Sequence, residues 1–283
     1  MDKNTWEALK FRRRFRVPFP FFEELVKEVE SQGWLGPETA DASDRPGIPL
    51  QLKVLAVLQI LGRGNCLDDI QQLSGMSQSR AQSTFHHFCE CFARDMYAKW
   101  IYVPEGNDLK DVMPMYEFLG AVGSTDVTHV RWERAPIPEG VHYMGKERFV
   151  AVMYQLTVDH TGFARGVTAG FPGARNGKTI MQYDGTIRNI RHDPKYTQLE
   201  YKLVDYEYEG NKYTEKGTHI IVDGGYHKSF PTWSIRLRWR CTICPFKASI
   251  TQAQAKWNKR PESVCKDVKC FFDRTKGRWR VLK

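Results

Sequence analysis

The stretch Gly123-Ser124-Thr125-Asp126-Val127-Thr128-His129 constrains the fold more than any other part of the chain. It follows an apolar run and contains several β-branched residues, so it predicts a β-strand. Asp126 is unusual in such a strand, because acids are poor strand formers and are rarely buried without a partner. An acid at such a position needs a reason, and a bound metal ion is a common one.

A second stretch has the same character. The apolar run Ile220-Ile221-Val222 ends in Asp223, and two glycines then turn the chain away. An Asp before Gly-Gly is often only a turn former. Two acids on separate strands of one sheet can nevertheless meet at one point, which is how oxygen ligands gather around Mg²⁺ or Mn²⁺. The pair together favours a metal site formed by Asp126 and Asp223.

Positive charge is concentrated at the C-terminal end. The 283 residues carry a net charge of +9, and the part from residue 236 onward carries +11. A basic tail on a nearly neutral body predicts a polyanion-binding surface, with nucleic acid as the favoured partner and an anionic membrane as the weaker alternative. The candidate phosphate contacts in this tail are Arg236, Arg238, Arg240 and Arg278.

The cysteines and the apolar runs indicate the cellular compartment of the protein. Seven cysteines without a secretory signal predict reduced thiols in an intracellular protein, and no apolar run is long enough to span a bilayer. Cys241-x-x-Cys244 with Cys265 and Cys270 has some features of a zinc site. Buried and surface thiols are the favoured alternative, because residues five apart on a helix point about 140° away from each other.

The first hundred residues are expected to be helical after a basic and aromatic segment. Residues 1–48 mix arginine and phenylalanine, which suits either phosphate and base contacts or a solvated surface with core anchors. Within 49–100, a short helix, a Gly turn and a longer helix beginning at Ser77 form the outline of a helix-turn-helix. Arg80 would then lie at the start of the recognition helix. A plain helical bundle fits the same pattern.

The pattern changes to strands beyond a Pro- and Gly-punctuated linker at 101–117. We expect a strand at 119–132, a hairpin of 149–158 and 164–171, a helix within 177–189, the strand ending at Asp223, and a helix at 259–278. This order predicts an α/β domain over 118–283 with a mixed sheet, which is the layout of a ribonuclease H-like domain.

Several ordered motifs in this region resemble those of PIF/Harbinger-type DDE transposases. The resemblance starts at about residue 50 and rests on the stretch around Asp126 and on these further motifs: Tyr143-Met144-Gly145-Lys146-Glu147, Thr157-Val158-Asp159-His160-Thr161-Gly162, Phe171-Pro172-Gly173-Ala174-Arg175-Asn176, Val222-Asp223-Gly224-Gly225-Tyr226, Asn258-Lys259-Arg260-Pro261-Glu262-Ser263-Val264, Lys266-Asp267-Val268 and Lys276-Gly277-Arg278-Trp279-Arg280-Val281-Leu282.

The resemblance implies a ribonuclease H-like core that cuts and joins DNA with Mg²⁺ or Mn²⁺. Asp126 and Asp223 would be the first two catalytic acids and the metal ligands. It also implies a nuclear protein with a Myb/SANT-like partner, and an oligomer is possible. Relatives usually continue beyond the last motif, so the expected core is short at its C-terminus.

Two positions depart from the family pattern. Lys269 stands where the family has its third acid, a Glu, and Gly177 stands where the family tends to have Asp. On one continuous helix Lys269 would share a face with Glu262 and with Asp273, which lies one turn, about 5.4 Å, further on. Asp273 is the candidate replacement for the third acid. The two readings are an impaired metal-dependent nuclease and an inactive, domesticated module that binds DNA or a Myb-like protein.

Overall fold

The computed structural model describes residues 5–36, 46–112, 119–204, 212–226, 242–245 and 251–283. The chain divides into two compact units. The helical unit comprises residues 1–100 with 274–283, and the sheet unit comprises residues 101–273. No helix in these described ranges is long and apolar enough to cross a membrane. Arg236, Arg238, Arg240 and Cys241 lie outside the described residues, so their proposed roles stay predictions.

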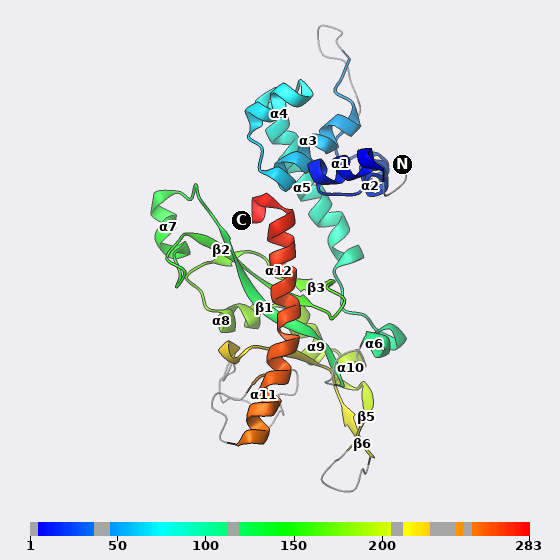
Figure 1. Ribbon diagram of the computed structural model, residues 1–283, viewed down its shortest axis with the longest axis vertical. Helices are drawn as coiled ribbons and strands as arrows, with labels where there is room; N and C mark the ends of the chain where they lie inside the picture. The colour runs from blue at the N-terminus through cyan, green and yellow to red at the C-terminus, as the bar shows by residue number, and fades with distance from the viewer. Residues whose placement is uncertain (1–4, 37–45, 113–118, 205–211, 227–241, 246–250) are drawn as a thin grey trace. The chain divides into compact units, whose positions relative to one another are not determined.

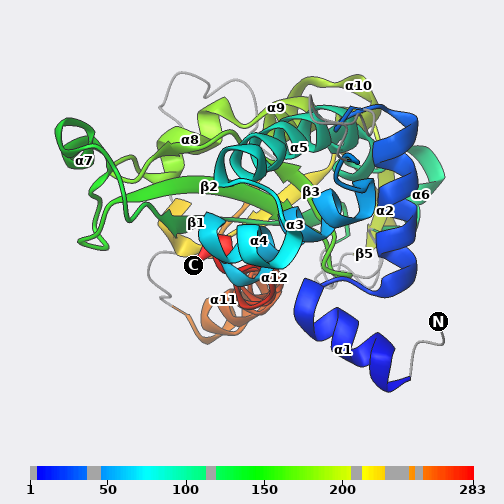
Figure 2. The same ribbon diagram turned by 90° about the horizontal axis from the view of Figure 1, so that it is seen from above.

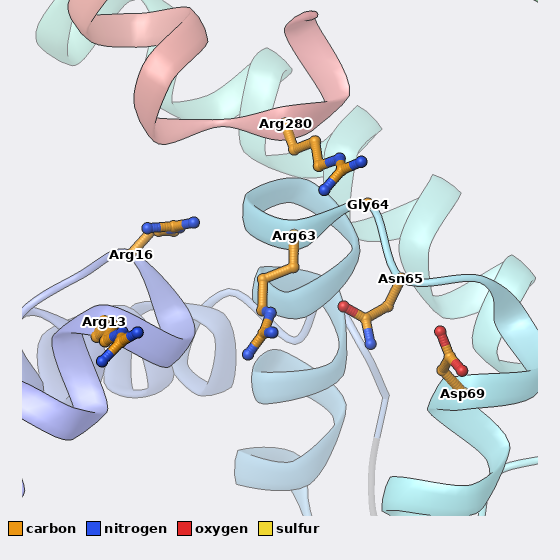
Figure 3. Close-up of a pocket in the computed structure, with 7 residues that line it drawn as sticks. All are labelled: Arg13, Arg16, Arg63, Gly64, Asn65, Asp69 and Arg280. Atoms are coloured by element: carbon orange, nitrogen blue, oxygen red, sulfur yellow. The ribbon is translucent and has the colours of Figure 1, made fainter.

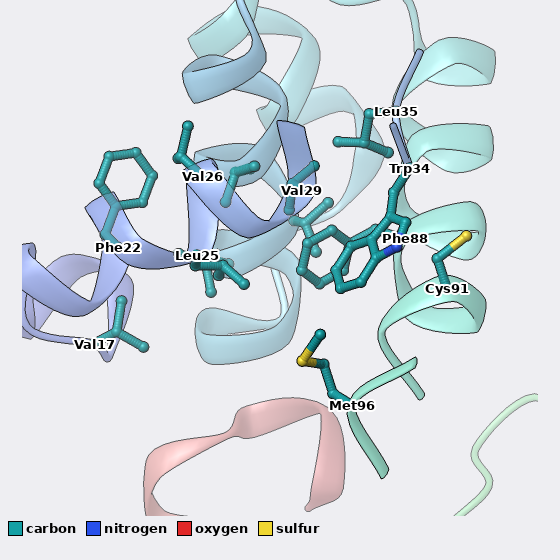
Figure 4. Packing of buried hydrophobic residues seen from close by; sticks show 13 residues of the cluster. Val17, Phe22, Leu25, Val26, Val29, Trp34, Leu35, Phe88, Cys91 and Met96 are labelled. Carbon is teal, nitrogen blue, oxygen red and sulfur yellow. The ribbon is translucent and has the colours of Figure 1, made fainter. Parts of the chain in front are cut away.

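In the described residues, the helical unit contains five complete helices and the end of α12 (Lys266–Arg278) (Figure 1). The complete helices are α1 (Trp6–Phe15), α2 (Phe19–Ser31), α3 (Leu50–Arg63), α4 (Leu67–Ser74) and α5 (Gln78–Trp100). A 3₁₀ turn, η4 (Arg280–Leu282), comes from the C-terminal segment. Figure 4 shows the main core, in which Phe22, Val29 and Trp34 from the first segment meet Phe88 and Met96 of α5. Residues 5–36 therefore contribute to the same core as α3 and α5.

The short and long helices expected around Ser77 are α4 and α5. Gly75 ends α4 with a φ of +73°, a conformation that favours glycine. Ser77 then caps α5, because its hydroxyl accepts a hydrogen bond from the Arg80 backbone N–H at 3.3 Å. Ile70 and Met76 pack with Ala56 of α3 and Ala81 of α5 in a second cluster. This cluster fixes the turn against α3.

The sheet unit contains a mixed six-stranded sheet with the order β3-β2-β1-β7-β8, and β4 also pairs with β2. Strand β1 is antiparallel to β2 and parallel to β7. A separate hairpin lies in the polar stretch beyond residue 191. The strands are β1 (Ala121–Arg131), β2 (Ala151–Val158), β3 (Ala164–Val167), β4 (Phe171–Pro172), β5 (Glu200–Val204), β6 (Lys212–Lys216), β7 (His219–Val222) and β8 (Thr242–Ile243).

Helices cover both faces of this sheet, as Figure 2 shows. On one face Met181, Ile187 and Ile190 pack with Val122 and Ile220. On the other face the helices of the C-terminal segment bury Cys265 and Val268 against β1, β2 and β7. The helices are α6 (Gly106–Val112), α7 (Ile137–Tyr143), α8 (Gly177–Tyr183), α9 (Gly185–His192), α10 (Pro194–Thr197), α11 (Gln252–Val264) and α12 (Lys266–Arg278), with the 3₁₀ turn η2 (Gly224–Tyr226). The unit is a mixed α/β domain.

Three sequence-based boundaries are wrong. The predicted linker at 101–117 contains α6, and Leu109 of that helix is fully buried in the core. The helix expected within 177–189 is two helices, because the Asp184 side chain accepts hydrogen bonds from the backbone of Thr186 and Ile187 and starts α9.

The expected helix at 259–278 starts earlier and is divided. Thr251 and Gln254 form a capping box that starts α11, and Cys265 separates α11 from α12. Glu262 and Lys269 therefore belong to different helices. Lys269 and Asp273 both lie on α12.

Candidate active site

The two predicted acids come together because of strand register. Thr125 of β1 pairs with Val222 of the parallel strand β7. Asp126 follows Thr125, and Asp223 follows Val222 directly after β7 ends. Parallel neighbours advance in the same direction, so the two carboxylates reach the same level of the sheet. The structure thus brings together the two acids that the sequence placed 97 positions apart.

The electrostatics of Asp126 show that the acids act on each other. Burial raises the pKa of the Asp126 carboxyl above its usual range, and the negative charge of Asp223 raises it further. A hydrogen bond from the Val127 backbone N–H, at 2.8 Å, works in the opposite direction. Positive charge near Asp126 therefore favours the ionised form of its carboxyl.

Lys269 supplies such a charge from α12. Its ammonium lowers the pKa of Asp126, and the charge of Lys146 does the same to a smaller extent. Lys269 is an exposed residue near the start of α12. A lysine thus acts on the Asp126 carboxyl from α12.

The role of Asp273 as a replacement for the third acid stays a prediction. Asp273 is exposed on α12, and the charged groups that act most on Asp126 are Asp223, Lys269 and Lys146. Among the described residues, no group of three or more His, Cys, Asp or Glu side chains is positioned to hold a metal ion.

Tyr226 and Cys265 also border the acids, although sequence reasoning gave them no role in the site. Burial and the charges of Asp126 and Asp223 raise the pKa of the Tyr226 hydroxyl well above its usual value. The same causes raise the pKa of the Cys265 thiol to about 12. The only sequence signal for Tyr226 was its place directly after Asp223-Gly224-Gly225.

Gly177, the second position that departs from the family pattern, packs against Tyr226 and Val127. A Cβ atom on this residue would come within 3.0 Å of the Tyr226 hydroxyl oxygen and 3.2 Å of Val127 Cγ2. Such contacts are tight, so a larger residue would require its neighbours to move. A side chain at position 177 would therefore press on Tyr226 and Val127, which pack in the core on one face of the sheet.

The other predicted residues lie elsewhere. Arg80 is exposed in the first turn of α5. Arg278 belongs to the helical unit, where its Nε donates a hydrogen bond to the Arg16 carbonyl at 2.7 Å. Burial and the charges of Arg12 and Arg16 lower the pKa of Arg278.

The proposed zinc ligands give no complete set. Cys241 lies outside the described residues, and no disulfide joins Cys244, Cys265 or Cys270 to another described cysteine. Cys265 is buried and Cys270 is exposed. The Cys244 thiol donates a hydrogen bond to the Asp223 carbonyl at 3.1 Å, so it supports the strand end that carries the second acid.

Asp126 and Asp223 fit a weakly held divalent cation. Mg²⁺ is commonly bound through one or two carboxylates with water completing its shell. The negative charges of Asp126 and Asp223 repel each other, which raises the pKa of Asp126. A cation between the two carboxylates would remove this repulsion. A two-metal centre needs more ligands than the described residues gather here.

The comparisons with known proteins agree with this chemistry. Residues 125–283 match the family described as DDE superfamily endonuclease, which is more than half of the chain. The chain belongs to this family of transposase-like nucleases, whose members generally use divalent metals and act on DNA. Comparisons with curated proteins and with solved structures found no significant match.

Proposed function

We propose that this protein is a PIF/Harbinger-type transposase derivative with a ribonuclease H-like core and a weakened metal-dependent DNA endonuclease site. Asp126 and Asp223 hold Mg²⁺ or Mn²⁺ in this proposal. The observation that supports it best is the influence of Lys269 on the Asp126 carboxyl, at the position of the third acid. The expected result is poor strand cleavage.

The physical argument is one of charge competition. An ammonium is a compact point charge that can partly replace a cation beside two carboxylates. Lys269 therefore stabilises the ionised form of Asp126 without a metal, and it repels a cation that approaches the acids. A divalent cation bound there would stabilise the charge that develops on the phosphodiester during cleavage. Asp126 and Asp223 would position it.

Plasmid nicking in Mn²⁺ tests this function. We expect little or no nicking by the wild-type protein and a gain in Lys269→Glu. Lys266→Glu is the matched control, because Lys266 is an exposed lysine on the same helix, and it should behave as wild type. Strong wild-type nicking that Asp126→Ala abolishes would contradict the proposed impairment.

The second candidate function is a binding module without cleavage. Its support is the short helix α4, the Gly75 turn and the exposed polar first turn of α5, which includes Gln78, Ser79 and Arg80. This module would bind DNA, or a Myb/SANT-like protein, in the nucleus, and an oligomer is compatible with both candidates. Loss of sequence-selective DNA binding in Arg80→Ala, with unchanged affinity for random DNA, would favour it.

A further inference from the structure

A cavity in the helical unit is lined mainly by arginines from three separate segments. It has a volume of about 470 Å³. Figure 3 shows Arg13, Arg16, Arg63 and Arg280 around one open space. They come from α1 and its C-cap, from the last turn of α3 and from η4. This arginine pocket is distinct from the acid site, which belongs to the sheet unit.

Two glycines at the end of α3 admit the arginine side chains. A Cβ atom on Gly62 would lie only 2.6 Å from Arg16 Cγ, so no larger residue fits there without displacing Arg16. Gly64 has a φ of +68°, and a Cβ atom on it would touch the Arg280 side chain at 3.5 Å. The alkyl stems of Arg16 and Arg280 thus rest on the chain, which leaves their guanidinium groups at the pocket.

The pocket gathers four arginines beside one acid in its lining. Within the described part of the chain, none of its four arginines forms an ion pair with a carboxylate. The acid in its lining is Asp69, whose carboxylate instead accepts a hydrogen bond from the Cys66 backbone N–H at 3.3 Å. Gathering unpaired like charges costs free energy, and an anionic ligand would offset that cost.

Helix capping explains part of this arrangement. The C-terminus of α3 carries partial negative charge and favours a nearby cation, and Arg16 Nε donates to the Gly62 carbonyl at 3.4 Å. One arginine is therefore enough to pair with the carbonyl at the end of α3. Arg13, Arg63 and Arg280 remain as donors that face the cavity, and guanidinium groups bind phosphate oxygens through paired N–H donors.

We propose that the arginine pocket binds backbone phosphate of DNA, independently of the metal site. The choice of DNA over a free phosphate ligand rests on the proposed function, since the family acts on DNA. The pocket is open and polar, which suits a phosphate on a strand that continues past it. Its contacts would be independent of base sequence.

Fluorescence anisotropy with a labelled random-sequence duplex in EDTA tests the proposal. Arg63→Gln and Arg280→Gln should each weaken binding by on the order of tenfold, as expected for a lost charge-assisted hydrogen bond. The double variant should make the log–log salt slope less negative by about two. Arg94→Gln is the control, since Arg94 is an exposed arginine of the same unit paired with Asp95, and it should bind nearly as wild type.

The Asp69→Asn variant should change DNA affinity in the opposite direction. The amide oxygen can still accept the Cys66 hydrogen bond, so α4 keeps its cap while the pocket loses its negative charge. DNA affinity should rise severalfold. The melting temperature of Arg63→Gln should stay equal or increase, because a repulsive charge has been removed; a lower value with unchanged DNA binding would show a purely structural role.

Two further results would overturn the proposal. Unchanged DNA affinity and salt slope in the double variant would exclude the pocket as a DNA contact. Calorimetric binding of pyrophosphate that the double variant loses, with DNA binding retained, would assign the pocket to a free phosphate ligand. Asp126→Ala should bind DNA in EDTA as wild type does, so failure of the metal site and failure of the arginine pocket give different results.

Discussion

Asp159 follows strand β2 and is fully buried, whereas Asp126 lies within the neighbouring strand β1 and is partly buried. Burial alone would raise the pKa of both carboxyls. At Asp159, hydrogen bonds from Thr161 and Phe163 and the charge of Arg165 outweigh burial and hold the pKa below its ordinary value. At Asp126 the net pKa is raised.

The difference lies in the partners. Arg165 meets Asp159 at 2.6 Å, and the backbone N–H groups of Thr161 and Phe163 donate at 2.9 and 3.0 Å. These partners lie in the turn that follows β2 and at the start of β3, so groups of the protein itself pair with the Asp159 carboxylate. Asp126 has a second acid beside it instead. A fold that retains two mutually repelling acids in its sheet has kept a charge suited to an external cation.

The largest expected effect is on Asp159. Asp159→Ala should destabilise the protein by about 3–5 kcal/mol, because it leaves the Arg165 guanidinium in a poorly solvated position without its carboxylate. Chemical denaturation would measure this. Asp108→Ala removes an exposed acid of the same unit and should change stability by at most about 0.5 kcal/mol. Equal stability of the two variants would remove the contrast between the two acids.

Replacing Asp126 should have the opposite effect on stability from replacing Asp159. The pKa of Asp126 is higher in the folded than in the unfolded state, so ionisation of this carboxyl destabilises the fold. This loss of stability begins as pH rises above 3.8 and is complete once pH exceeds the folded-state pKa. Asp126→Asn should therefore raise the melting temperature at neutral pH, and this gain should disappear below pH 3.8. For Asp159 the stabilisation is present above 3.8 and is lost as pH falls through its lowered pKa. A neutral-pH loss of stability in Asp126→Asn would contradict this account.

The smallest expected effect is the change in the pKa of Asp126 when Lys269 or Lys146 is replaced. Lys269→Gln and Lys146→Gln should both raise the pKa of Asp126, and the change should be larger for Lys269. Carbon-detected NMR titration of the Asp126 carboxyl would measure both changes. A larger effect from Lys146 would place the dominant positive charge away from the position of the third acid.

The acid pair could be predicted from sequence because each acid stands out locally. Asp126 interrupts a β-branched strand, and Asp223 ends an apolar one. Their register needed the structure, which shows Thr125 beside Val222. The role of Asp159 as a buried ion-pair partner was also invisible, because an Asp in a hairpin turn is usually exposed.

The arginine pocket could not be predicted. Arg13 lies in α1 and Arg16 caps its end, whereas Arg63 and Arg280 lie far along the chain, and no local pattern links these positions. Helix α6 was missed because its sequence, Gly106-Asn107-Asp108-Leu109-Lys110-Asp111-Val112, has only two apolar residues. Long-range packing of Leu109 stabilises that helix more than its own propensity does.

Calorimetric titration of Mn²⁺ tests most directly whether the acid pair is a metal site weakened by Lys269. We expect weak binding to the wild-type protein, no binding to Asp126→Ala or Asp223→Ala, and clearly tighter binding to Lys269→Glu than to the control Lys266→Glu. Equal Mn²⁺ affinity in the wild type and all four variants would contradict the account.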